Sequence, residues 1–149
     1  QEALNEAGLE VIEERLYAGE VSYQHGVQAA ARLCQQQDIT AVFAAADILG
    51  VGVVKGLRQQ GRRVPEDVSV MGFDDLDLAQ ICDPSLTTVR QDIAAKGRQA
   101  ILAILDALDG KPEKQEWIFP VNLVVRDSVR SVGEPVVTKK TASPEARGS

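Results

Sequence analysis

The stretch RRVPEDVSVMGFDD, residues 62–75, carries the clearest fold signal in the sequence. Its apolar segment from Val68 to Phe73 has the length and composition of a buried strand. That segment runs directly into two adjacent carboxylates, Asp74 and Asp75, with a third acid at Asp77. The pattern predicts a strand that ends at a polar loop, and it leaves open what the acids bind.

A second stretch, TAVFAAAD at residues 40–47, also consists of an apolar run followed by an aspartate and lies earlier in the chain. The continuous apolar run from Ala41 to Ala46 is typical of a strand buried on both faces in a parallel sheet. Asp47 is expected to cap the next helix, which should end at Gly61. Strand, helix and strand joined by short loops predict an α/β fold with a parallel, doubly wound sheet.

Caps, periodicity and chain breakers predict the remaining elements. These are the end of a helix at Gly8, a helix from Ser22 to about Cys34, an extended piece from Leu86 to Arg90, a helix from Asp92 to Gly110, and a last pair of short strands split by Pro120. Residues 133–149 turn polar without apolar periodicity, which predicts a flexible tail.

Composition narrows the classes of function. A chain of 149 residues with 44% hydrophobic content can bury the core of one domain. A net charge of -6 argues against this chain itself binding nucleic-acid phosphates, and no apolar run approaches the roughly 20 residues that span a bilayer. Cys34, Cys82 and the single His25 lack the spacing of a metal site. We therefore expect no metal, no cofactor and no membrane contact.

Both acidic stretches are expected at one edge of the sheet. In an open parallel sheet, ligands bind outside the carboxyl ends of the strands, where Asp47 follows one strand and Asp74 the next. A carboxylate there can accept hydrogen bonds from vicinal hydroxyls, which suits a sugar or polyol. Paired acids also suit a phosphoacceptor or magnesium site, although the later strands end in Arg90 and Arg126 rather than in the lysine of a receiver domain. Spacing alone leaves both interpretations open.

Four segments occur together in a characteristic order: TAVFAAAD, RVPEDVSVMGFDD, PSLTTVRQD followed by KGRQAILAIL, and LVVRDSV. In this respect residues 1–132 resemble the effector-binding core of the lactose and galactose repressor (LacI/GalR) family of transcriptional regulators. The resemblance implies a type I periplasmic-binding-protein-like fold, with the C-terminal subdomain and an excursion at residues 86–110 that belongs to the N-terminal subdomain.

The resemblance also implies partners. A family member senses a small-molecule effector, forms a homodimer, performs no catalysis, and works in the cytoplasm. It contacts DNA through a helix-turn-helix domain that is absent from this chain. A periplasmic or surface solute-binding protein, which shares the fold, is the alternative.

Some of the positions that bind effector in the family carry the expected residue in this sequence, and others do not. Asp74 matches a sugar-hydroxyl acceptor, and Asp75 is expected to order the loop. Ala46 stands where the family commonly has an effector-binding Asn, and Val21 stands where it often has an aromatic ring that stacks on the sugar. Tyr23 could substitute for that ring or lie on the surface.

Two further positions, Gln91 and Ile93, would face the cleft from the other subdomain. Because Val21, Ala46 and Ile93 are small or apolar, the resemblance implies a less polar or atypical ligand, or a regulator that responds to something else.

The family's two-fold interface matches six positions: Val51, Val54, Lys55, Leu78, Ile81 and Cys82. Core packing is the alternative for Val54 and Ile81. The helix from Asp92 to Gly110 would lack a sheet to pack on in this chain, so its apolar side chains should be exposed and favour association.

Overall fold

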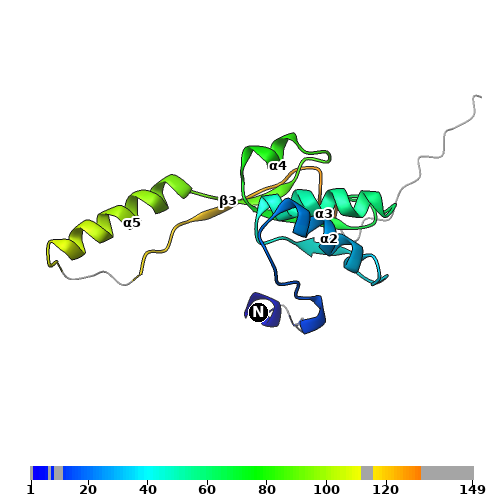
Figure 1. Ribbon diagram of the computed structural model, residues 1–149, viewed down its shortest axis with the longest axis horizontal. Helices are drawn as coiled ribbons and strands as arrows, with labels where there is room; N and C mark the ends of the chain where they lie inside the picture. Colours follow the sequence, from blue (N-terminus) through cyan, green and yellow to red (C-terminus); the bar gives the residue numbers. More distant parts are fainter. Residues whose placement is uncertain (1, 7, 9–11, 112–115, 132–149) are drawn as a thin grey trace, which may run out of the picture.

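The computed structural model describes residues 2–6, 8, 12–111 and 116–131, so the predicted tail at residues 133–149 lies outside the described residues. Figure 1 shows a sheet with helices packed on it and one long helix that projects away. In chain order the elements are α1 (Glu2–Glu6), the 3-10 helix η1 (Glu13–Arg15), α2 (Tyr23–Leu33), β1 (Ala41–Phe43), α3 (Asp47–Gln59), β2 (Ser69–Asp74), α4 (Asp77–Ile81), β3 (Thr87–Gln91), α5 (Ile93–Leu108) and β4 (Val121–Val124).

The strands follow the order β1-β2-β3-β4 across the sheet. β1 pairs with β2, and β2 with β3, in parallel, whereas β4 runs antiparallel to β3. The predicted parallel α/β sheet is therefore confirmed, with an antiparallel strand at one edge. The predicted pair of strands around Pro120 is wrong in part, because β4 is the one strand found among residues 116–131. Among the described residues, the sheet contains β4 but no strand at residues 116–119.

Helix boundaries follow the predicted caps. Ser22 caps α2 by accepting a hydrogen bond from the His25 amide at 3.2 Å. Asp92 caps α5 by accepting one from the Ala95 amide at 2.8 Å. Gly61 follows α3 with φ of +78°, the left-handed conformation in which glycine commonly ends a helix. Local sequence chemistry therefore sets where these helices begin and end.

Helices α2 and α3 pack closely against each other (Figure 1). A Cβ atom on Gly26 would lie 2.3 Å from the Leu49 carbonyl oxygen, and one on Gly52 would lie 2.3 Å from the Tyr23 carbonyl oxygen. Glycine is required at both positions for the helices to approach this closely. The buried core comprises Ala30, Leu33, Ile39, Val53, Val54, Leu57, Val64, Val68, Val70, Ala79 and Leu86.

The strand at β1 is buried on one face rather than on both. Phe43 is 62% exposed and Ala41 is exposed, whereas Ala44 and Ala46 are buried. Successive side chains of a strand point to opposite faces, so the exposed residues share one face. The prediction of two buried faces is wrong because an apolar run does not reveal whether a second layer covers it.

Asp47 does not cap α3, contrary to the prediction. The helix begins at Asp47, with Ala46 at the N-cap position and no side-chain capping bond. The fully buried Asp47 carboxylate turns toward the sheet, where it accepts hydrogen bonds from the Leu76 amide at 2.7 Å and the Thr88 hydroxyl at 2.6 Å. Gly72 lies against it, since a Cβ there would be 2.3 Å from a carboxylate oxygen. One side chain thereby ties α3 to the loop after β2 and to β3.

The long helix α5 projects from the sheet and buries none of its residues (Figure 1). As expected, its apolar side chains are exposed: Ile101, Leu102, Ile104, Leu105 and Leu108. Despite this apolar surface, no helix in the described parts of the chain is long and apolar enough to cross a membrane.

Replacing Asp47 with alanine should lower the free energy of unfolding by about 2 to 3 kcal/mol, because the Leu76 amide and the buried Thr88 hydroxyl would lose their acceptor. Chemical denaturation measures this loss. The control is Asp106→Ala, which removes an exposed carboxylate paired with Lys111 and should cost less than about 1 kcal/mol. Equal losses in the two variants would contradict the role of Asp47.

Candidate functional site

Asp74 and Asp75 lie at the carboxyl end of β2 in an uncommon backbone conformation. Asp74 ends the strand with φ of +110°, and Asp75 follows with φ of +59°. A residue other than glycine held at positive φ costs on the order of 1 to 3 kcal/mol, and such residues cluster at functional sites. Aspartate is among the residues that adopt this region most readily. The two adjacent carboxylates bind different partners.

The Asp75 carboxylate is held by two arginines. Its side chain is 4% exposed and accepts hydrogen bonds at 2.5 Å from Arg90 Nε in β3 and at 2.5 Å from an Arg126 terminal nitrogen after β4. Arg126 also donates to the Leu86 carbonyl oxygen at 2.8 Å. Asp75 therefore joins the loop after β2 to both strands that lead to and from α5, which agrees with the predicted loop-ordering role.

Burial raises the pKa of the Asp75 carboxyl, but hydrogen bonds from Arg126 and Arg90, together with their charges, lower it further than burial raises it. The pKa therefore lies below the ordinary value of 3.8, and Asp75 is ionised at neutral pH. Because arginines occupy both oxygens of Asp75, this carboxylate is a poor ligand for Mg²⁺. Within the described residues, no group of three or more His, Cys, Asp or Glu side chains could hold a metal ion.

The half-buried Asp74 carboxylate has a different environment. It accepts a hydrogen bond from the side-chain amide of Gln91, at the end of β3, and forms no ion pair with any described residue. The Gln91 carbonyl oxygen in turn accepts a hydrogen bond from the ammonium of Lys96 in α5. The structure thus brings together two predicted site residues, Asp74 and Gln91. Lys96, which was not predicted from the sequence, contacts Gln91. Its signal in the sequence was only a cation five residues after Gln91.

A cavity of about 430 Å³ opens beside this contact. It is lined by Arg90, Gln91, Asp92, Ile93, Pro120 and Asn122. Ile93 is 50% exposed and supplies an apolar wall, while its predicted contact with an effector stays a prediction. The volume lies within the range of small-molecule sites, roughly 300 to 1,000 Å³. The carboxyl end of β3 therefore offers space next to a carboxylate, an amide and an apolar surface.

The remaining predicted effector residues belong to other elements. Ala46 is buried at the end of the β1 segment, directly before Asp47. Val21 is 62% exposed in the loop before α2, and Tyr23 is the half-buried first residue of that helix. Among the described residues, no hydrogen bond joins Val21 or Tyr23 to Asp74. Their contact with an effector stays a prediction.

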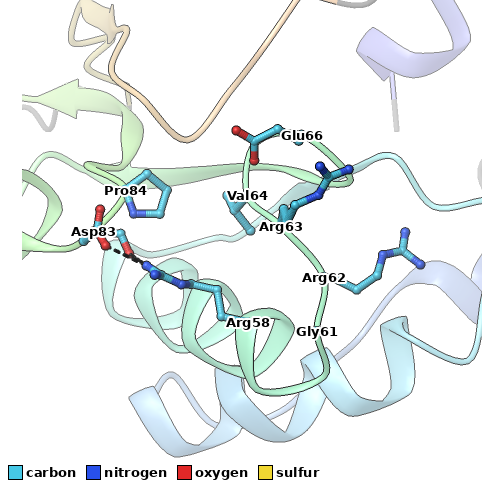
Figure 2. Close-up of a pocket in the computed structure, with 8 residues that line it drawn as sticks. All are labelled: Arg58, Gly61, Arg62, Arg63, Val64, Glu66, Asp83 and Pro84. Carbon is cyan, nitrogen blue, oxygen red and sulfur yellow. Dashed lines mark hydrogen bonds and ion pairs between the residues drawn. The ribbon is translucent and has the colours of Figure 1, made fainter.

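A second cavity, of about 330 Å³, lies beyond the C-terminal end of α3 (Figure 2). Its lining is Arg58, Gly61, Arg62, Arg63, Val64, Glu66, Asp83 and Pro84, none of which is a predicted site residue. Figure 2 shows Arg58 reaching Asp83, and their ion pair spans 2.8 Å. Arg63 is paired with Asp67 at 2.5 Å. This cavity lies near the start of β2, whereas ligands of open parallel sheets bind at the opposite, carboxyl end of the strands.

The residues after β4 attach the returning chain to the sheet. Buried Ser128 donates a hydrogen bond to the Val70 carbonyl oxygen at 2.6 Å and accepts one from the Thr87 amide at 2.8 Å. Asp127 accepts one from the Ser85 hydroxyl at 2.5 Å. Together with Arg126, these contacts hold the start of β3 next to the residues that follow β4.

The residues predicted for a dimer contact lie on α3 and α4 or directly after α4: Val51, Val54, Lys55, Leu78, Ile81 and Cys82. Ile81 is 83% exposed, and Lys55 is also exposed. Val54 is 2% exposed and packs in the core, so it has no surface to offer a second chain. Burial raises the pKa of the Cys82 thiol, which donates to the Pro84 carbonyl oxygen at 3.2 Å. The helix α4, which carries two of these residues, was not predicted.

The fold and site together define one class of protein. A mainly parallel sheet with polar groups and a cavity at its carboxyl edge is the arrangement of small-molecule-binding α/β domains. The family described as the periplasmic binding protein-like domain matches residues 1–129. The chain belongs to this family, in the form found in transcriptional regulators of the LacI type.

Curated relatives of the chain are regulators of that type. The HTH-type transcriptional regulator MalR of Streptomyces coelicolor is 41% identical over 82% of this chain and 36% of its own length. CelR of Thermobifida fusca is 38% identical over 86% of this chain and 38% of its own length. The repressor CytR of Escherichia coli K12 is 35% identical over 88% of this chain and 39% of its own length. The chain thus spans less than two fifths of the length of these relatives.

Solved structures agree with the sequence comparison. The transcriptional regulator CelR in complex with cellobiose matches with a TM-score of 0.77 at 38% identity, covering 85% of this chain and 39% of that one. A structure described as a putative transcriptional regulator LacI from Bacillus cereus subsp. cytotoxis matches with a TM-score of 0.82 at 30% identity, covering 89% of this chain and 48% of that one. These matches confirm the predicted fold class and the resemblance to LacI-type regulators.

The Asp75 ion pairs predict a pH dependence. Because the folded-state pKa is lowered, their stabilisation is fully present above the ordinary carboxyl pKa of 3.8 and is lost as the pH falls through the lower folded value. Denaturation between about pH 6 and pH 2 should show the free energy of unfolding falling more steeply in the wild type than in Asp75→Asn, which cannot titrate. Identical slopes would show that these ion pairs do not stabilise the loop.

Proposed function

We propose that this chain is part of the ligand-sensing and dimerisation core of a LacI-type DNA-binding regulator. The observation that carries the proposal is the Asp74 carboxylate, held at the end of β2 by a positive-φ turn, with only the Gln91 amide as partner among the described residues. A small-molecule effector binds there, beside the cavity that Gln91 and Ile93 line. It supplies hydroxyl groups to Asp74 in place of the Gln91 amide.

The effector is sugar-like, with a less polar or atypical face. One structural relative is described as a complex with cellobiose, which supports a sugar in this type of cleft. In this chain Ala46 and Val21 offer no hydrogen-bonding side chain, and Ile93 adds an apolar wall. Most of the polar recognition in this part of the cleft therefore falls to Asp74 and Gln91.

Residues 86–110 extend from this subdomain to a second one. β3 leads out of the sheet, α5 carries an exposed apolar surface, and β4 returns antiparallel to β3. Packing against the N-terminal subdomain would bury that surface, so β3 and β4 serve as connections between the two subdomains. Effector binding at the ends of these strands can then change how the subdomains are oriented.

DNA is contacted by a helix-turn-helix domain outside these 149 residues, because a net charge of -6 disfavours binding of nucleic-acid phosphates by this chain. The protein works in the cytoplasm with its operator DNA. We propose that it performs no catalysis, because its curated relatives are transcriptional regulators. The relatives favour this regulator over a solute-binding protein of the same fold.

Replacing Asp74 with alanine in the full-length protein should weaken effector binding by about tenfold to a hundredfold, since a hydrogen bond to a buried charged group contributes roughly 1.5 to 3 kcal/mol. Calorimetry measures the affinity, and a DNA-release assay measures its consequence. Asp127→Ala, which removes a carboxylate at the other end of the sheet, is the control and should leave effector affinity unchanged. If Asp74→Ala responds to effector like the wild type, the role of Asp74 is wrong.

We infer that the homodimer forms through α3 and α4, which lie against each other (Figure 1). The surface available there consists of Val51, Lys55, Leu78, Ile81 and Cys82, of which Ile81 is the most exposed apolar side chain. An exposed isoleucine next to a half-buried leucine is typical of the apolar centre of an interface.

Replacing Leu78 with aspartate should raise the dimer dissociation constant at least about tenfold, because a carboxylate would be buried without a partner. Sedimentation velocity at several protein concentrations measures the change. Gln80→Asp places the same charge on the same helix at an exposed position and should leave the dimer intact. A Leu78→Asp protein that remains fully dimeric would place the interface elsewhere.

A further inference from the structure

Lys96, Gln91 and Asp74 form a continuous line of polar contacts across three elements. The Lys96 ammonium donates to the Gln91 carbonyl oxygen, and the Gln91 amide nitrogen donates to the Asp74 carboxylate. These residues belong to α5, the end of β3 and the end of β2, respectively. One neutral amide therefore stands between a cation and an anion.

The charges around this line leave two groups uncompensated. Asp75 is paired with Arg90 and Arg126, and Asp92 accepts the hydrogen bond that caps α5. In the described part of the chain, Lys96 has no carboxylate within ion-pairing distance, and Asp74 has no cation. If these residues served stability alone, a direct ion pair between Lys96 and Asp74 would stabilise the fold more than two hydrogen bonds to a neutral amide.

The Gln91 amide indicates what chemistry could replace it. Its NH₂ group donates to Asp74 as a ligand hydroxyl would, and its carbonyl oxygen accepts from Lys96 as an anionic ligand oxygen would. A charged oxygen would bind the ammonium more strongly than the neutral carbonyl does. Gln91 lines the cavity of about 430 Å³, whereas Asp74 and Lys96 do not, so a ligand in that cavity reaches both charged groups only by displacing the Gln91 side chain.

We propose that Lys96 is a specificity-determining residue of the effector site and that it selects anionic polyols, sugars in which a carboxylate or phosphate accompanies a hydroxyl, over their neutral counterparts. This inference rests on the proposed function and deepens it. The ligand's hydroxyl binds Asp74, its anionic oxygen binds Lys96, and the Gln91 amide is displaced from between them. Neither Asp74 nor the apolar Ile93 wall would favour an anion, and Arg90, the cation in the cavity lining, is already paired with Asp75. The preference therefore depends on Lys96.

Calorimetric titration of the full-length protein with matched pairs of ligands tests the proposal. The pairs are glucose with gluconate, glucose with glucose 6-phosphate, and cellobiose with cellobionate, so that the carboxylate and phosphate arms are separate. In the wild type, the anionic member of at least one pair should bind about tenfold more tightly than the neutral member. Lys96→Gln should abolish that ratio, and Lys96→Arg should restore most of it because the charge is retained.

Arg98→Gln is the matched control, since it removes a positive charge from an exposed position two residues further along the same helix. It should leave the ratio at the wild-type value. Equal loss in Arg98→Gln and Lys96→Gln would show general charge attraction and overturn the assignment. So would a panel in which no anionic member binds more tightly than its neutral counterpart.

Asp74→Asn separates this inference from the proposed function. If Asp74→Asn weakens every ligand while Lys96→Gln leaves the anionic preference intact, the effector site stands and the role of Lys96 is refuted. If Lys96→Gln abolishes the preference while Asp74→Asn changes no affinity, Lys96 selects the anion and Asp74 is not the anchor of the site.

Discussion

The buried carboxylate of Asp47 is the contact on which the arrangement of the site depends. It accepts hydrogen bonds from the Leu76 amide and the Thr88 hydroxyl, and so joins the start of α3, the loop after β2, and β3 at one point. Gly72 must lack a side chain for this contact to form. A buried charge is tolerated only where such donors surround it. The position of Asp74 follows from this contact, because Asp74 lies between Gly72 and Leu76.

The two acids after β2 have different partners, and we propose a structural role for one and an effector-binding role for the other. Asp75 binds two arginines and holds the loop against the strands that lead to α5 and back. Asp74 is left with a neutral amide that a ligand can displace. Their consecutive positive φ values separate the two side chains, so one acid can be locked while its neighbour stays available.

Local chemistry made much of the fold predictable from the sequence. Ser22, Asp92 and Gly61 marked helix ends correctly, because caps depend on residues only a few positions apart. Asp47 was misread as a cap because its true partner, Thr88, is 41 residues away and no local pattern reports it. The family resemblance supplied the positions of Asp74 and Gln91, but the hydrogen bond between them requires the register of β2 and β3. The exposed face of β1 could not be foreseen, since an apolar run does not show what covers it.

The most direct test is a crystal structure of the full-length protein with its effector bound. The account predicts that an effector hydroxyl lies within hydrogen-bonding distance of the Asp74 carboxylate, that the Gln91 amide has left that position, and that Asp75 keeps both arginines. An effector bound elsewhere, with the hydrogen bond from Gln91 to Asp74 intact, would contradict it.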